Sequence, residues 1–177
     1  MHLETERLIL TPIKEEDWPL FKTLHQSADV MRYVTDNLSE DNIRSRFDAR
    51  LRDWEPRCND WLTLTIKLKE TGEKLGVTGF YAEWEPYQQA ELGFLLSPEF
   101  QGKGYAKEST IALLDYIFEE QTYHKAVATV TEGNAPSAKL LQSLGFQLEG
   151  TIRDNFKLNG QWYNDLKLGL LRHEYKS

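Results

Sequence analysis

The chain has 177 residues, of which 40% are hydrophobic and 28% are charged, and its formal net charge is −7 at pH 7. Length and composition are typical of one folded domain with a buried core, so we expect residues 1–177 to form a single domain. The acidic balance argues against general nucleic-acid binding, which requires a basic face. It is compatible with a cationic substrate.

The chain shows no targeting or cross-linking signal. The first seven residues lack a basic segment followed by an apolar core, and no apolar run approaches membrane-spanning length. The single cysteine, Cys58, has no partner for an internal disulfide and no metal-motif spacing. We therefore expect a cytoplasmic protein without a metal site.

The N-terminal half of the chain alternates between strand and helix patterns. A helix is predicted from Trp18 because acids precede it and apolar residues recur at helical spacing. The pattern over 61–69 alternates apolar and polar residues, which predicts a half-buried strand. The other elements predicted here are a strand over 8–13, a helix from Ser39 to Trp54, and a strand over 75–84 that forms a hairpin with 61–69.

The C-terminal half continues the alternation. The apolar run Leu92 to Leu96 predicts a buried strand, which Pro98 ends because proline cannot donate to a strand ladder. Asn159-Gly160 is a strong signal for a two-residue hairpin turn. The remaining predictions are helices over 103–120 and 137–144 and strands over 125–131, 146–153 and 163–171.

The predicted order is β-α-α-β-β-β-α-β-α-β-β, which indicates an α/β (mixed α+β) fold with a mixed central sheet flanked by helices. The three strands before the long helix are expected to form an antiparallel meander. The strand–helix–strand unit over 92–131 is expected to be parallel, with a right-handed crossover.

The segment Gln101-Gly102-Lys103-Gly104-Tyr105-Ala106 joins a predicted strand to the start of a predicted helix. Free amides and the positive end of the helix dipole favour an anion there, and glycines let a ligand approach the backbone. The two glycines alone do not identify the anion, and a plain strand-to-helix turn has the same pattern. The third glycine of a dinucleotide fingerprint is missing.

Two longer patterns identify the family that the chain resembles. Gln101-x-x-Gly104-x-Ala106 resembles the Q/R-x-x-G-x-G/A signature of the GNAT (GCN5-related) N-acetyltransferases, and the pattern from Asn134 through Ser137 to Gly145-Phe146 resembles their second motif. The segments 3–10, 90–93 and 148–150 look like the RimJ/RimL branch, which acetylates N-terminal amines of ribosomal proteins and has relatives acting on small amines. The resemblance covers nearly the whole chain and implies the GNAT fold.

The resemblance implies that the anion is the pyrophosphate of acetyl-CoA. The backbone amides from Gln101 to Ala106 would hold it, Lys103 would add charge, and Asn134 would face the pantetheine arm near the thioester. Leu95 and Leu96 would offer backbone groups to that arm as a neighbouring strand would. The predicted cofactor-binding residues are Leu95, Leu96, Gln101, Gly102, Lys103, Gly104, Tyr105, Ala106, Asn134 and Ser137.

Acetyl transfer to an amine requires a base for the amine and a proton for the departing thiolate. Strand alternation and the resemblance make Glu91 the first candidate for the base, and Glu83 is the second; each is equally well interpreted as a solvated acid at a strand end. In many GNAT enzymes the general acid is a tyrosine, at the position where this chain has Leu141. Ser137 resembles the serine that RimL-type enzymes place near the thiolate, although a helix-start serine bonded to backbone fits as well. We expect direct transfer without a covalent intermediate on Cys58 or Ser137.

The groove for the acceptor amine is expected between the first two helices, residues 17–54, and the closing hairpin around 155–163. Its candidate lining residues are Asp36, Trp84, Asp154, Trp162 and Tyr163. The leading hypothesis is an acetyl-CoA-dependent N-acetyltransferase acting on a protein N-terminal amine. The alternatives are acetylation of a polyamine or an amine toxin, and a non-catalytic acyl-CoA sensor.

Overall fold

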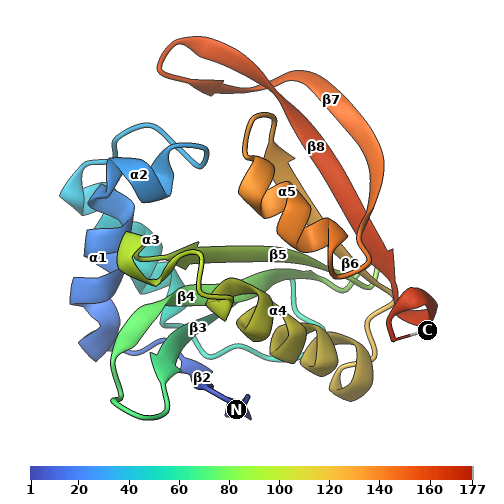
Figure 1. Ribbon diagram of the computed structural model, residues 1–177, viewed down its shortest axis with the longest axis horizontal. Coiled ribbons are helices and arrows are strands. Elements are labelled where there is room, and N and C mark those ends of the chain that lie inside the picture. The colour runs from blue at the N-terminus through green and yellow to red at the C-terminus, as the bar shows by residue number, and fades with distance from the viewer. Residues whose placement is uncertain (177) are drawn as a thin grey trace.

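The computed structural model describes residues 1–176. Within these residues a single mixed sheet has eight strands in the order β1-β2-β3-β4-β5-β6-β8-β7 (Figure 1). All neighbouring strands are antiparallel except β5 and β6, which are parallel as predicted. The strands are β1 (Leu3–Glu4), β2 (Leu8–Pro12), β3 (Trp61–Leu68), β4 (Lys74–Glu83), β5 (Gln89–Leu96), β6 (Lys125–Thr131), β7 (Gln147–Leu158) and β8 (Gln161–Leu171).

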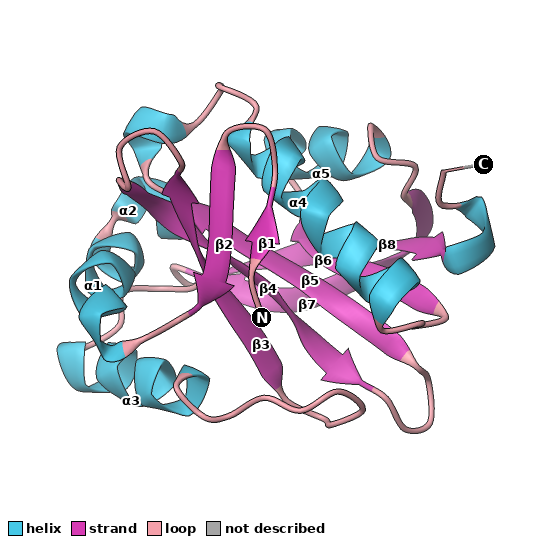
Figure 2. Cartoon of the chain, turned by 90° about the horizontal axis from the view of Figure 1, so that it is seen from below, coloured by secondary structure: helices cyan, strands magenta, loops and turns pink. Residues whose placement is uncertain are grey.

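Helices cover both faces of the sheet (Figure 2). One face packs against α4 and α5 through the larger apolar cluster, which includes Leu113, Ile117 and Leu141. The other packs against α1 and α3 through Phe21 and Phe47. The helices are α1 (Trp18–Gln26), α2 (Ala28–Met31), α3 (Glu40–Arg50), α4 (Tyr105–Asp115), which continues into a π-helical turn (Tyr116–Glu120), and α5 (Ala135–Gln142). No helix within 1–176 is long and apolar enough to cross a membrane.

Two local predictions were wrong. The second predicted helix ends at Arg50, not Trp54, and Trp54 packs edge-on against Phe80, with ring centroids 5.5 Å apart, in the cluster beneath α4. Pro56 disfavours helix at the residue before it, so a continuous helix through this region is unfavourable. The strand β3 is buried on both faces between 62 and 66, because α1 and α3 cover the polar side that carries Thr63 and Thr65.

Strands β5 and β6 separate soon after they meet. They pair only where Gln89–Glu91 faces Lys125–Val127, and beyond Glu91 the two strands have no paired positions. We call this region, between 92–96 of β5 and 128–131 of β6, the splay. It leaves one edge of β5 without a strand partner, at the end of β5 that leads into the glycine turn.

The last two strands form a long hairpin that arches away from the body of the sheet (Figure 1). Asn159 and Gly160 form its two-residue loop, both with positive φ (48° and 80°), as a type I′ turn requires. The turn prediction is confirmed, and the strands on either side are longer than predicted. The hairpin therefore reaches over the splay from the β6 side.

Candidate active site

Two cavities meet at the splay. The turn cavity, of about 500 Å³, lies along the glycine turn and the start of α4. The splay cavity, of about 400 Å³, lies between the separated ends of β5 and β6 and extends toward β3, α3 and the hairpin. Both are lined by Tyr33, Val34, Phe94, Leu95, Asn134 and Ser137. A ligand lying along the turn cavity can therefore present one end to a second molecule in the splay cavity.

The turn cavity is lined by all the predicted cofactor-binding residues except Lys103. Gly102 and Gly104 have φ of +72° and +84°, a conformation that glycine adopts without strain, and Gly104 is the N-cap of α4. The backbone amides of residues 102–107 donate no hydrogen bond to any acceptor within residues 1–176. Together with the positive end of the helix dipole, these free amides have the geometry and charge to hold a phosphate group.

Gln101 has a different role from the one predicted for its amide. Its amide donates to the carbonyl of Pro98 at 3.1 Å, and its side-chain Nε2 donates to the carbonyl of Leu96 at 3.0 Å. Gln101 therefore fastens the turn to the end of β5, and the free amides begin at Gly102.

The N-terminal segment supports the same turn from outside. Arg7 pairs with Glu108 of α4 (Nη2–Oε2 2.6 Å), donates to the Lys103 carbonyl at 3.2 Å, and stacks over the Tyr105 ring at 4.5 Å. The Arg7 amide and the Thr5 hydroxyl also donate to Glu108. Burial alone would raise the pKa of Glu108, but these bonds hold that pKa below its usual value. Lys103 contributes its carbonyl to this arrangement, and its side chain lies outside both cavities.

Strand alternation decides which backbone groups of β5 face the splay. The amide of Ser97 donates to the Leu75 carbonyl, so odd-numbered residues near this end turn their polar backbone groups toward β4. The backbone groups of Phe94 and Leu96 therefore face the splay, and those of Leu95 do not. This corrects the prediction for Leu95, which lines both cavities but is bonded on the β4 side.

Asn134 and Ser137 lie at the junction of the two cavities, on α5. The Asn134 side chain caps the helix by accepting from the Ser137 amide at 3.4 Å. The Ser137 hydroxyl has no hydrogen-bond partner within 1–176, whereas those of Ser109, Thr110 and Ser143 donate to carbonyls three or four residues back. The Ser137 hydroxyl is therefore free to donate to a ligand.

Glu91 lies at the last paired position before the splay. It lines neither cavity, but its Oε1 accepts from the hydroxyl of Thr129, at 2.5 Å, and Thr129 does line the splay cavity. Lys167 donates to the same hydroxyl at 2.5 Å and lies 3.8 Å from Glu91. Glu91 is thus connected to the splay cavity through one hydroxyl.

The other predicted acids and aromatics lie away from the splay cavity. Glu83 lies near the opposite end of β5 and is bonded by the side chain of Gln89. None of the five predicted lining residues, Asp36, Trp84, Asp154, Trp162 and Tyr163, lines the cavity. The hairpin arches so that its tip extends past the cavity, which leaves Trp162 54% exposed, and Trp84 packs against Tyr123 in the core.

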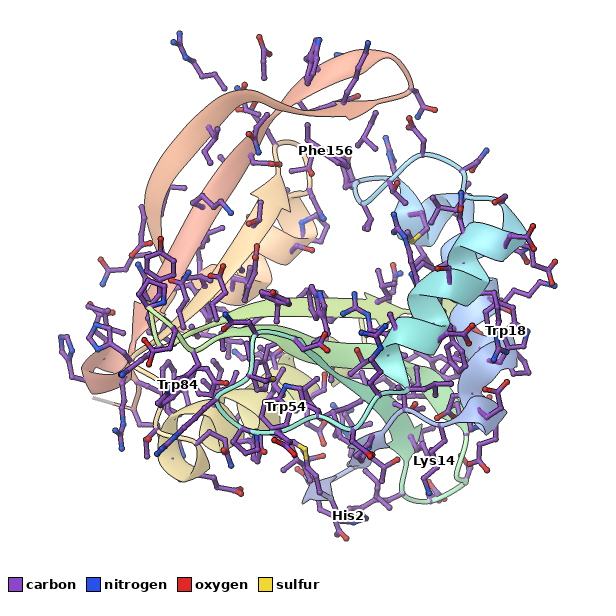
Figure 3. The ribbon with its side chains drawn as sticks, turned by 180° about the vertical axis from the view of Figure 1, so that it is seen from behind. His2, Lys14, Trp18, Trp54, Trp84 and Phe156 are labelled. Carbon is purple, nitrogen blue, oxygen red and sulfur yellow. The ribbon has the colours of Figure 1, made fainter. Side chains whose placement is uncertain are left out.

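The structure places other functional side chains in the splay cavity: Tyr33, Arg50, Trp61, Phe156 and Asp165. Phe156 lies on the inner side of the hairpin arch (Figure 3). Asp165 is only 5% exposed; its Oδ2 accepts from Asn155 at 2.8 Å, and the Thr131 hydroxyl oxygen lies 3.4 Å from its Oδ1. The sequence contained one signal for it, an acid on a strand of mostly apolar residues, two positions after Tyr163.

Known proteins similar to this chain are acetyltransferases, which agrees with two substrate cavities that meet. Residues 7–147 match the family model described as an acetyltransferase (GNAT) domain. The chain belongs to the GNAT family. The match covers most of the chain and both motifs that carried the resemblance. GNAT acetyltransferases use acetyl-CoA as acetyl donor, and the chain is an N-acetyltransferase of this family.

Several relatives cover most of the chain. An uncharacterized N-acetyltransferase, p20, of Bacillus licheniformis is 34% identical, over 98% of this chain and 97% of its own. Two others are 27% identical. The match to the spermidine N(1)-acetyltransferase of Escherichia coli covers 94% of this chain and 87% of the relative, and the match to the putative ribosomal N-acetyltransferase YdaF of Bacillus subtilis covers 70% and 68%. The structure of a spermidine N-acetyltransferase from Vibrio cholerae with CoA and spermine superimposes with a TM-score of 0.86, at 21% identity over 98% and 100% of the two chains.

The turn cavity fits the acetyl donor of a GNAT enzyme. It offers free amides and a helix N-terminus for the pyrophosphate, and the unpaired edge of β5 for the amide groups of the pantetheine arm. Within residues 1–176, no three His, Cys, Asp or Glu side chains are grouped to hold a metal ion.

Proposed function

We propose that this GNAT enzyme transfers the acetyl group of acetyl-CoA directly to a primary amine bound in the splay cavity, with residues 1–177 acting as one catalytic domain. The observation that carries the proposal is the junction of the two cavities at Asn134 and Ser137. Two substrates bound in the two cavities have their reacting ends at the same place, which lowers the entropic barrier to reaction.

Each proposed role follows from a contact. The amides of 102–107 bind the pyrophosphate, and Phe94 and Leu96 bond the pantetheine arm along β5. Thr129 takes a proton from the amine and passes its own to Glu91, since its hydroxyl already donates to that carboxylate. The neutral amine nitrogen then bonds to the acetyl carbon as the carbon–sulfur bond breaks. The free hydroxyl of Ser137 donates its proton to the sulfur and is restored by the second proton that the nitrogen releases. The Tyr33 hydroxyl at the same junction is an alternative donor.

The acceptor we favour is a small primary amine. Above the splay, Asp36 accepts from the backbone amide of Asn159 at 2.7 Å, and the Thr131 hydroxyl donates to the Tyr33 carbonyl at 3.0 Å. These bonds join the loop after α2 to the hairpin and to β6, and they restrict access to a cavity of about 400 Å³. A flexible N-terminus of a protein is the second candidate. It is favoured by the relative named as a putative ribosomal N-acetyltransferase.

Two measurements test the proposal. Saturating acetyl-CoA should raise the free energy of unfolding by about 2.7 kcal/mol at one hundred times its dissociation constant. Thiol release should then appear with at least one member of a panel of amino acids, polyamines, amine antibiotics and N-terminal peptides of ribosomal proteins. An absent thermal shift would refute the cavity assignment. A shift with no turnover across the panel would instead support an acyl-CoA sensor.

A further inference from the structure

Arg50 reaches the splay cavity from α3, which covers the face of the sheet that lines the cavity. It is the last residue of α3, and its guanidinium lies 4.1 Å from the ring centroid of Trp61. The Trp61 indole in turn extends from β3 to β5, where its atoms lie 3.4 Å from the position that a Cβ on Gly93 would occupy. The stacking therefore holds the positive charge above β5, on the wall of the cavity beside the splay.

Arg50 has no anionic partner there. Within 1–176, no carboxylate lies within ion-pair distance of it, although Arg7 pairs with Glu108 and Arg44 with Glu15 and Asp48. Burial lowers the pKa of Arg50 to about 10, an effect that Asp60 opposes and Arg46 reinforces. The group is still charged at neutral pH, and a half-buried cation without a counter-ion is unfavourable.

The charges around the splay cavity are of both signs, on different walls. Arg50 is the cation on the wall that α3 contributes. Burial lowers the pKa of His25 on α1, and the charges of Arg46 and Arg50 lower it further. The buried carboxylate of Asp165 lies on the other wall, on β8. A polyamine, which carries only positive charges, would place some of them against Arg50.

We propose that Arg50 binds a carboxylate or a similar oxyanion of the acceptor, so that the preferred acceptors are amines that also carry an anionic group. The planar guanidinium, positioned over the Trp61 ring, has donors in the fork geometry that suits a carboxylate. The proposal rests on the proposed function, since it names the acceptor class of the same cavity. It makes Arg50 a residue that determines specificity.

Matched acceptors test the role of Arg50. Leucine and leucinamide, methionine and methioninamide, and β-alanine and its amide differ only in the carboxylate. Wild-type enzyme should show a kcat/KM about 10- to 100-fold higher for the preferred acid than for its amide, since a hydrogen bond to a charged group contributes about 1.5–3 kcal/mol. In Arg50→Gln this preference should disappear through a higher KM for the acid, with the amide unaffected.

Two further variants separate charge from geometry and from folding. Arg52→Gln removes the same charge from an exposed residue outside the splay cavity and should keep the wild-type preference. Arg50→Lys keeps the charge without the planar fork, so it should recover part of the preference. A wild-type enzyme that prefers the amide, or an Arg50→Gln enzyme with an unchanged ratio, overturns the proposal.

Calorimetry keeps this test separate from the test of the proposed function. Titration of each acid and amide into enzyme saturated with CoA measures acceptor binding without turnover. Weaker binding of the preferred acid to Arg50→Gln than to Arg52→Gln supports the proposal even where no thiol is released. Equal binding to both, or no binding of any acid to wild type, contradicts it.

Discussion

A single hydroxyl, that of Thr129, connects Glu91 to the splay cavity. The distance of 2.5 Å from that hydroxyl to Oε1 makes the carboxylate an acceptor for its proton, and Lys167 fixes the hydroxyl from the other side. A carboxylate behind a hydroxyl can take the amine's proton without contacting the amine. The order of the groups also explains why Glu91 can serve as a base although it lines neither cavity.

Replacing Glu91 with glutamine should lower kcat by about 100-fold or more, since a positioned base contributes on the order of 10²-fold or more. The dissociation constant for acetyl-CoA should not change, because Glu91 lies outside the turn cavity. Glu83→Gln is the matched control. It removes the carboxylate of Glu83, which is on β4 and lines neither cavity, so this variant should have the wild-type kcat. Steady-state thiol release measures both, and equal rates in the two variants would exclude Glu91 as the base.

Asp17 connects the start of α1 to the sheet. Burial alone would raise its pKa, but bonds from Lys74 at 2.5 Å, the Lys14 amide at 2.9 Å and the Thr65 hydroxyl at 2.8 Å hold the pKa of this carboxyl below its usual value. A lowered folded-state pKa stabilises the protein above the pKa of the unfolded chain, about 4. That stability is lost as the pH falls through the folded-state value.

Asp17→Asn should therefore lower the free energy of unfolding at pH 7 by about 2 kcal/mol, the value of a hydrogen bond to a charged group. The difference between wild type and variant should shrink as the pH falls below about 4. Urea denaturation at a series of pH values measures this difference. A difference that is constant across that range would show that Asp17 stabilises the fold by packing and not by charge.

At the scale of elements, the glycine turn is the part of the site that depends most on backbone conformation. Gly102 and Gly72 offer a matched pair: their φ values are +72° and +73°, and a Cβ on either would meet nothing within 4 Å. Gly102 lines the turn cavity, and Gly72 lies in the turn between β3 and β4. Substitution at either causes the same backbone strain, about 1–2 kcal/mol.

Gly102→Val should weaken acetyl-CoA binding at least tenfold, because the new side chain and the strained turn disturb the amides that face the phosphates. Gly72→Val should lose a similar amount of stability and keep wild-type affinity. Calorimetric titration with acetyl-CoA compares the two. Similar affinities would place the pyrophosphate somewhere other than this turn.

Local signals predicted the elements and the turn cavity well, because both depend on residues close in sequence. The Asn159-Gly160 turn is an example, and it is confirmed. The splay cavity was predicted poorly, since it depends on where β5 and β6 stop pairing and on a Trp61 ring that crosses two strands. No local pattern specifies that Arg50 and Asp165, 115 positions apart, line one cavity.

At the scale of the molecule, the splay divides the sheet into two parts that line the two cavities. The part with β1 to β5 includes the glycine turn and Arg50 of α3, and the part with β6 to β8 includes Ser137, Asp165 and the hairpin. Only three paired positions of β5 and β6 join the strands directly, and the bonds from Asn159 to Asp36 and from Thr131 to Tyr33 bridge the open end. This arrangement has room for two substrates at once, which predicts a ternary complex.

The most direct test is an initial-rate study in which acetyl-CoA and the best acceptor amine are both varied. Transfer between two substrates bound together predicts double-reciprocal lines that intersect, and no acetylated enzyme in mass spectra of the protein incubated with acetyl-CoA alone. Parallel lines, together with an acetyl group trapped on Ser137 or Cys58, would contradict direct transfer across the junction of the two cavities.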